Sequence, residues 1–298
     1  MSAVAHFVYG RGVVKPPLVL ALGATSLVGV ALRRRAEVTI VHCVAPVDKP
    51  QTDGRLTVRV EDAADMAALL ERLRPQSILY CHAVCDVGRC EEDPAWAHEI
   101  NVGGVQNLLR AVSPDTRVVY VSSDHVFGTD GRYTESCTPR PISVYGRTRV
   151  LAEELVLQRP NSLVVRPGLA VGPSLNGRTG HMDWLRYRSA RGLPITIVED
   201  EARSAVWADA LAERLVKCAL DTACGIRNIP ATRLVSRPEL ARHLLALQNL
   251  APAFDVTNRA ARPFPHLGRV ELRSVYNDSL SAPLPSVIDR GLAVGEIE

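Results

Sequence analysis

Lysine is nearly absent from this chain of 298 residues, occurring only at Lys15, Lys49 and Lys217. Lysine and arginine together number 35, so the other 32 basic residues are arginine. No basic run is longer than Arg33–Arg35, and the formal net charge is only +3. This charge pattern gives no support for a nucleic-acid-binding surface.

Long apolar runs are also absent, because no segment approaches the roughly 18 consecutive apolar residues that a membrane span requires. Residues 1–17 lack the basic, apolar and small-residue regions of a secretory signal. The seven cysteines are odd in number, and several lie within apolar runs. The sequence therefore predicts a cytoplasmic protein with reduced thiols and no membrane partner.

Short apolar runs alternate with amphipathic segments over the first half of the chain. Strands are expected at residues 18–22, 38–41, 56–60, 77–81, 117–122 and 162–166, and helices at 63–73, 99–112, 144–157, 206–220 and 237–248. Such alternation predicts an α/β fold with a doubly wound parallel sheet. We expect an N-terminal extension over residues 1–17 and a nucleotide-binding domain over 18–167. Residues 168–298 are expected to form mainly a smaller substrate-binding lobe, from which helix 206–220 returns to the sheet.

A glycine-bearing loop follows the first expected strand and leads into a helix. Backbone N–H groups at such a turn can hold a pyrophosphate, which predicts a Rossmann-type coenzyme site at Gly23, Thr25, Ser26, Leu27 and Gly29. Ser26 stands where the middle glycine of this motif is usual, so its hydroxyl either donates to phosphate or crowds it. The alternative is a plain strand-to-helix turn.

The segment after the second expected strand bears on coenzyme choice. Residues 41–44 contain no acid to accept the adenosine ribose hydroxyls, which favours NADP(H) over NAD(H). Arg33–Arg35 could reach a 2′-phosphate, or could simply complement the dipole at a helix C-terminus.

Three side chains are candidates for hydride-transfer chemistry. Tyr145 and Arg149 are four residues apart, so on a helix they share one face, and Ser123 follows an apolar strand-like run. A phenol, a hydroxyl and a fixed cation in one place can polarise a carbonyl beside a nicotinamide ring. We therefore predict Ser123, Tyr145 and Arg149 as catalytic residues.

The chain after residue 17 resembles the dTDP-4-dehydrorhamnose reductase-like family of extended short-chain dehydrogenases/reductases. This family includes the regulatory beta subunit of methionine adenosyltransferase. The motifs that carry the resemblance are Leu73-Arg-Pro75, Glu91-x-x-Pro94, Ile100-Asn101-Val102, Ser122-Ser-Asp-His-Val-Phe127, Val144-Tyr-Gly146, Glu153-Glu154, Arg166-Pro-Gly168 and Arg203 before Trp207-Ala-Asp209.

The resemblance implies roles for individual residues. Ser123 matches the catalytic Thr/Ser, Tyr145 the proton donor, and Arg149 the position where the family has lysine. Asn101 matches an asparagine that braces the active-site strand, and Asp62 resembles an adenine-contacting acid or else caps the following helix. Coenzyme contacts are also implied at Cys81, His82 and Ala83. Substrate contacts are implied at Asp124, His125, Leu169, Trp184 and Arg203.

Two local patterns leave alternatives open. Trp184, Arg186, Tyr187 and Arg188 could bind a nucleotide diphosphate by stacking and phosphate contacts, or could be part of an ordinary lobe helix. The spacing Cys81-His82-x-x-Cys85-x4-Cys90 permits a zinc site, but a strand end with apolar thiols explains it as well. We predict no metal.

The function predicted first is NADP(H)-dependent reduction of a keto group on a nucleotide-linked sugar or a related ketone. The alternative is a catalytically impaired, NADP-binding regulatory or scaffold protein, because arginine cannot release a proton and is wider than lysine. An epimerase or dehydratase lacks a second acid/base residue that could be placed. The expected partner is a small-molecule substrate, and a homodimer is compatible with this interpretation.

Overall fold

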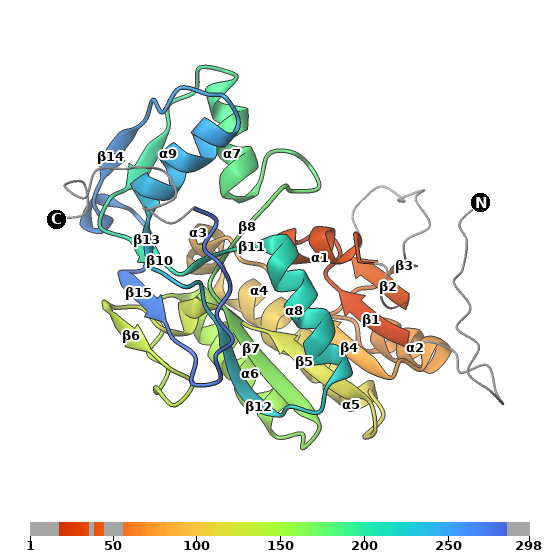
Figure 1. The fold of residues 1–298 in the computed structure, drawn as a ribbon. Helices are drawn as coiled ribbons and strands as arrows, with labels where there is room; N and C mark the ends of the chain where they lie inside the picture. Colours follow the sequence, from red (N-terminus) through yellow and green to blue (C-terminus); the bar gives the residue numbers. More distant parts are fainter. Residues whose placement is uncertain (1–17, 36–38, 45–55, 285–298) are drawn as a thin grey trace, which may run out of the picture.

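The computed structural model describes residues 18–35, 39–44 and 56–284, so the extension over 1–17 lies outside the described residues. Its centre is a seven-stranded sheet in the order β12-β7-β5-β4-β1-β2-β3, with every neighbouring pair parallel (Figure 1). The strands are β1 (Leu18–Leu22), β2 (Thr39–Val44), β3 (Leu56–Thr57), β4 (Ser77–Tyr80), β5 (Arg117–Val121), β7 (Ser162–Pro167) and β12 (Gly225–Ile229). The predicted doubly wound parallel sheet is confirmed.

Helices cover both faces of this sheet. On one face, α1 (Leu27–Leu32) and α8 (Ala208–Leu220) pack on an apolar core of β1, β4, β5 and β7 residues. On the other, α2 (Ala63–Leu73), α5 (Gly104–Ala111) and α6 (Val144–Leu157) cover a second core. Both strand faces are therefore buried, which explains why the strands read as continuous apolar runs.

A smaller lobe lies beside the carboxyl ends of the strands, at the top of the view in Figure 1. It contains α7 (Gly180–Ser189) and α9 (Arg237–Leu247), with paired strands β9 (Thr196–Val198) and β14 (Asp255–Thr257). Short strands join the lobe to the main domain: β8 (Leu169–Val171) pairs with β11 (Ala205–Trp207), and β6 (Gly131–Tyr133), β10 (Ala202–Arg203), β13 (Val235–Ser236) and β15 (Arg269–Leu272) form a four-stranded sheet. Among the described helices, none combines the length and apolarity needed to cross a bilayer.

Four expectations differ from the structure. The strand expected over residues 56–60 is shorter, because β3 pairs with β2 only at Leu56 and Thr57. The helix expected from residue 206 begins at Ala208, because Val206 and Trp207 are held in β11 by pairing with β8. The segment expected as one helix over 99–112 starts with a π-helical turn, Glu99–Gly103, before α5. In addition to α8, strand β12 returns from the second half of the chain and pairs with β7 at the edge of the main sheet.

Helix α6 is fixed to the sheet by a buried ion pair. Glu153 on α6 receives two-pronged hydrogen bonds from Arg166 on β7, with Nη2–Oε2 at 2.6 Å. Both side chains are only 2% exposed. A buried ion pair holds its two side chains in one arrangement, because separating them leaves a buried charge unpaired. The pair therefore fixes how α6, with its expected catalytic residues, lies against β7.

A second set of charges joins the lobe to the end of β5. Arg203 on β10 makes paired hydrogen bonds to both carboxylate oxygens of Asp124, and its Nη1 also contacts Glu201 at 3.2 Å. His266 Nδ1 lies 3.1 Å from the other Glu201 oxygen. Asp124, Glu201 and Arg203 are buried, so this network links the turn after β5 to two lobe segments.

Replacing Arg166 by methionine should leave the buried Glu153 carboxylate without its ion-pair partner. We expect Arg166→Met to lower the free energy of unfolding by about 3–5 kcal/mol in urea titrations. Lys217→Met is the matched control, because the Lys217–Glu213 pair is exposed and solvent screens its charges, so its loss should change the stability little. The double variant Arg166→Met/Glu153→Met should recover much of the loss. Equal small effects for the Arg166 and Lys217 variants would contradict this account.

Acid should weaken the lobe network through Glu201. Burial alone would raise the pKa of Glu201, but the hydrogen bond from His266 and the charges of Arg237 and Arg203 hold it below the ordinary value of 4.5. A lowered folded-state pKa gives stability that is present above the unfolded pKa and is lost as pH falls.

We therefore expect Glu201→Gln to lower the melting temperature at pH 7, with the difference from the parent protein shrinking as pH falls below about 5. Melting curves at neutral and acidic pH measure this, and Glu71→Gln, an exposed carboxylate on α2, is the control. A pH-independent difference would show that the carboxylate charge of Glu201 is not what stabilises the network.

Candidate active site

A close approach of α6 to the turn after β5 brings Ser123 and Tyr145 together. Ser123 follows β5, and Tyr145 lies in the first turn of α6. A Cβ at Gly146 would lie 2.3 Å from the carbonyl oxygen of His125, so only glycine permits this approach. The side chains of Tyr145 and Ser123 interact, so the structure brings these two predicted residues together.

The surroundings of Tyr145 keep its phenol protonated. Burial raises the pKa of Tyr145 above the ordinary value of 10.0, and this outweighs the lowering by the charge of Arg149 and the hydrogen bond with Ser123. The charge of Arg149 alone would move this pKa toward neutrality, but desolvation of a phenolate in the interior is the larger effect.

Arg149 points into the protein and is only 3% exposed. Its Nη1 donates to the Tyr120 hydroxyl at 2.8 Å, and its Nη2 donates to the Val121 carbonyl at 2.7 Å. The centre of its guanidinium lies 5.5 Å from the centroid of the Tyr145 ring. The predicted phenol, hydroxyl and cation therefore do occupy one place at the end of β5.

The glycine loop has the form that a dinucleotide pyrophosphate requires. Gly23 adopts φ +96°, and a Cβ there would lie 2.7 Å from the backbone nitrogen of His82. The Ser26 hydroxyl donates to the Gly23 carbonyl at 2.8 Å and accepts from Gly29 N–H at 3.0 Å. Ser26 is thus the N-cap of α1, and neither of its hydroxyl bonds goes to a ligand position. Thr25 is exposed and Leu27 half-buried at this loop.

Residues after β4 form the neighbouring wall of this loop. Cys81 is buried, whereas His82 and Ala83 are half-buried. Burial lowers the pKa of His82 to about 4, so this imidazole is neutral at physiological pH. Asn101 is fully buried and connects the segment after β4 to α6, because its amide bonds both backbone groups of Val84 and the Thr148 hydroxyl. These contacts run to the segment after β4 and to α6, so the bracing of the active-site strand that the resemblance implies for Asn101 stays a prediction.

Charged residues expected near the adenosine end have protein partners. Asp62 accepts hydrogen bonds from the backbone of Ala64 and Asp65, so it caps α2. Arg34 pairs with Asp209, and Arg35 contacts the Asp209 carbonyl and the Glu213 carboxylate. Arg34 and Arg35 therefore connect the end of α1 to α8. Of the two interpretations of this basic run, helix-end charges fit the structure better.

The expected substrate residues fall into two groups. Asp124 and Arg203 bond each other in the buried network described above, and the His125 ring meets the Tyr145 ring edge-on with centroids 5.1 Å apart. Burial lowers the pKa of His125 to about 4, which keeps it neutral. Leu169 is half-buried on β8 and packs with Trp184 against the lobe core. As substrate contacts, these residues remain predictions.

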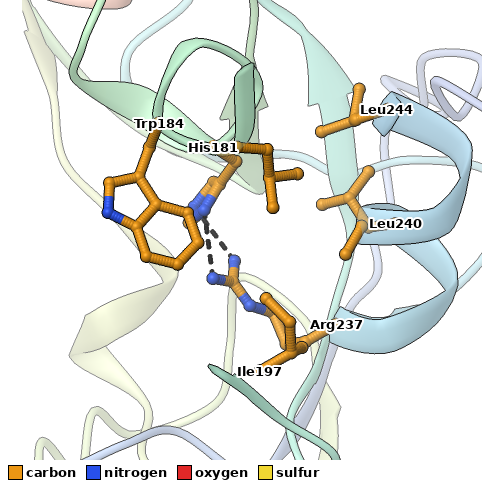
Figure 2. A pocket seen from close by; sticks show the side chains of 8 residues that line it. His181, Trp184, Ile197, Arg237, Leu240 and Leu244 are labelled. Carbon is orange, nitrogen blue, oxygen red and sulfur yellow. Dashed lines mark hydrogen bonds between the residues drawn. The ribbon is translucent and has the colours of Figure 1, made fainter. Parts of the chain in front are cut away.

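A pocket in the lobe contains two basic residues that the sequence did not single out. His181 from α7 and Arg237 from the start of α9 face each other beside Trp184, with nitrogen–nitrogen distances of 3.0 Å (Figure 2). Arg186 and Arg188 on α7 instead bond Asp183 and the Pro194 carbonyl. This arrangement favours the interpretation of α7 as a lobe helix over phosphate binding by its arginines.

Sequence reasoning also missed Tyr120. It lies within the apolar run of β5, which looks like any buried strand, and the signal that could have singled it out is a hydroxyl two residues before Ser122. Among the described residues, no group of three or more His, Cys, Asp or Glu side chains is arranged to hold a metal ion. Cys90 Sγ instead lies 3.8 Å from the Val84 carbonyl.

Several features of the site fit a nicotinamide dinucleotide. They are the tight Gly23 turn, the capped start of α1, and the cluster of Ser123, Tyr145 and Arg149 at the neighbouring strand ends. Arg149 Nε adds a buried donor that has no partner among the described residues. Ligands of open α/β sheets bind at this edge, where the strand order reverses. Gly23, Thr25, Leu27 and the residues after β4 would line the dinucleotide, with Tyr145 and Arg149 beside its reactive ring.

Comparison with known proteins places the chain among sugar-nucleotide enzymes and one regulatory subunit. A family model described as the RmlD substrate binding domain matches residues 18–267. The dTDP-4-keto-6-deoxy-D-glucose reductase of Streptomyces niveus is 30% identical over 225 residues, covering 73% of this chain and 75% of that protein. Methionine adenosyltransferase 2 subunit beta of Rattus norvegicus is 32% identical over 142 residues.

That beta-subunit match covers 47% of this chain and 42% of the subunit, so the chain spans less than half the length of these relatives. Among solved structures, dTDP-4-dehydrorhamnose reductase from Bacillus anthracis str. Ames, in complex with NADP, superposes with a TM-score of 0.76 and 20% identity. The superposition covers 90% of this chain and 95% of that one, which shows a shared fold. Because the family model spans most of the sequence, the chain belongs to the RmlD substrate binding domain family, that of the dTDP-4-dehydrorhamnose reductases.

Proposed function

We propose that the protein is an NADP(H)-dependent reductase of a keto group on a nucleotide-linked sugar. The observation that carries this proposal is the protonated phenol of Tyr145, held between the Ser123 hydroxyl and the Arg149 guanidinium at the coenzyme edge of the sheet. The relative from Streptomyces niveus, named as a reductase of a dTDP-linked 4-keto-6-deoxy sugar, supports the substrate class.

Each catalytic residue has a defined task in this reaction. A bound reduced nicotinamide supplies the hydride that reaches the carbonyl carbon. The Tyr145 phenol donates its proton to the carbonyl oxygen, and the Ser123 hydroxyl hydrogen-bonds that same oxygen. The positive charge of Arg149 stabilises the phenolate that Tyr145 becomes. The Tyr145 phenol is protonated at neutral pH, as reduction requires, and the charge of Arg149 opposes the rise in pKa by which burial makes the phenol a weaker acid.

The coenzyme preference for NADP(H) rests on the acid-free sequence at residues 41–44. Arg34 and Arg35 do not add to this argument, because both bond residues of α8. Solved relatives include one named as bound to NADP and a UDP-glucose 4-epimerase from Thermus thermophilus named as bound to NAD. Fluorescence titrations with NADPH and NADH decide the preference, and failure of both to bind would remove every redox function.

A regulatory protein without turnover is the second candidate. It is favoured by the bonds that hold both terminal amino groups of Arg149 on protein acceptors and so direct the guanidinium into the interior. The beta-subunit relatives also fit it. Arg149→Lys separates the candidates: an enzyme changes its rate and pH profile, whereas a regulatory protein shows no turnover with either residue.

Removing the Tyr145 hydroxyl tests the proposed chemistry. We expect Tyr145→Phe to lower kcat for NADPH oxidation with a dTDP-linked 4-keto-6-deoxyhexose by about 10²–10⁴-fold, because a positioned acid contributes that much. The coenzyme Kd should be unchanged. Tyr276→Phe, which alters a half-exposed tyrosine, is the control. Undiminished turnover in the Tyr145 variant would reject this residue as the proton donor.

A further inference from the structure

The position of Arg149 depends on neutral acceptors alone. Nη1 and Nη2 donate to the hydroxyl of Tyr120 and the carbonyl of Val121, two consecutive residues of β5. No carboxylate pairs with Arg149 in the described part of the chain, and its Nε has no partner. A buried cation without a counter-ion is expensive to hold, so these two acceptors are what keep it in place.

Two aromatic rings complete the surroundings of this cation. The guanidinium centre lies 5.1 Å from the Tyr120 ring centroid and 5.5 Å from that of Tyr145. Both distances are within the range of cation–π attraction. Tyr120 therefore contributes twice, through its hydroxyl and through its ring, and it sets the distance between the charge and the phenol of Tyr145.

The shape of this site suits arginine rather than lysine. A guanidinium is a planar fork that reaches two acceptors at once, whereas an ammonium is a compact point charge on a different stem. Tyr120 and Arg149 thus match each other across β5 and α6. This pairing gives a physical reason for arginine at the position where the family has lysine.

We propose that the Tyr120 hydroxyl and the Val121 carbonyl form a receptor for a guanidinium group, which makes Tyr120 a positioning residue that holds the charge of Arg149 against Tyr145. The existence of this receptor follows from the bonds of Arg149 to Tyr120 and Val121. Only its effect on catalysis rests on the proposed reductase function. The two bonds hold the guanidinium beside the Tyr145 ring, so Arg149 acts on Tyr145 through its charge.

The receptor can be tested with free guanidinium as the probe. In Arg149→Ala the side chain is absent, and low-millimolar guanidinium chloride should bind in its place and raise the melting temperature in a saturable manner. Sodium chloride at the same ionic strength is the reference salt. In Arg149→Ala/Tyr120→Phe the apparent Kd should rise about tenfold or more, because a hydrogen bond from a charged donor is lost.

Tyr80→Phe provides a matched control. Tyr80 lies opposite Tyr120 on the neighbouring strand β4, is equally buried, and its hydroxyl has no hydrogen-bond partner. Arg149→Ala/Tyr80→Phe should therefore bind guanidinium as tightly as Arg149→Ala. No saturable binding to Arg149→Ala, or equal affinity with Phe and Tyr at position 120, would overturn the receptor.

Turnover separates this proposal from the proposed function. Guanidinium should partly restore NADPH-dependent reduction in Arg149→Ala and in its Tyr80→Phe derivative, but not in its Tyr120→Phe derivative. Binding in the expected pattern without turnover by the parent protein would support the receptor and reject the reductase.

A second measurement tests the proposal without the Arg149→Ala variant and so does not depend on the folding of that variant. Nitrogen NMR of the arginine side chains reports rotation about the guanidinium bonds, which two fixed acceptors slow. In the Tyr120→Phe variant, which retains Arg149, the rotation of the Arg149 guanidinium should become faster. In the Tyr80→Phe variant it should stay slow. Unchanged rotation in Tyr120→Phe would overturn the proposal.

Discussion

The site depends on the contact between the first turns of α6 and the turn that follows β5. Gly146 allows the helix to approach the His125 carbonyl, and the Glu153–Arg166 pair fixes the same helix to β7. With α6 held at two points, Tyr145 and Arg149 have little freedom relative to Ser123. A proton donor and a cation can act on one carbonyl only if their positions are fixed in this way.

The pKa of Tyr145 is set by two opposing effects, burial of the phenol and the charge of the buried Arg149. Burial raises the pKa of Tyr145 more than Arg149 lowers it, and burial also keeps His82 and His125 neutral. Arg149 therefore brings a buried positive charge to this neighbourhood, with no carboxylate partner among the described residues. Because Arg149 is buried beside the Tyr145 ring, water screens its charge little and the charge acts strongly on the phenol.

Buried ion pairs, in addition to apolar packing, hold the lobe against the main sheet. Arg203 reaches from β10 to Asp124, directly beside Ser123, and Glu201 extends the same network to His266. The lobe is thus attached at the residue next to Ser123. This bond brings the motif around Asp124 and the distant motif around Arg203 together in the fold.

The sequence by itself determined the parallel sheet, the glycine turn and the set Ser123, Tyr145 and Arg149, because apolar periodicity and local spacing report on strands, helices and helix faces. Capping by Ser26 and Asp62 was within reach of sequence reasoning, since capping is a local interaction. Only the tertiary structure decided that β11 precedes α8, that β12 joins the main sheet, and that Arg149 bonds Tyr120. These depend on contacts between residues far apart in the chain, and desolvation of Tyr145 depends on everything packed around it, which no local pattern records.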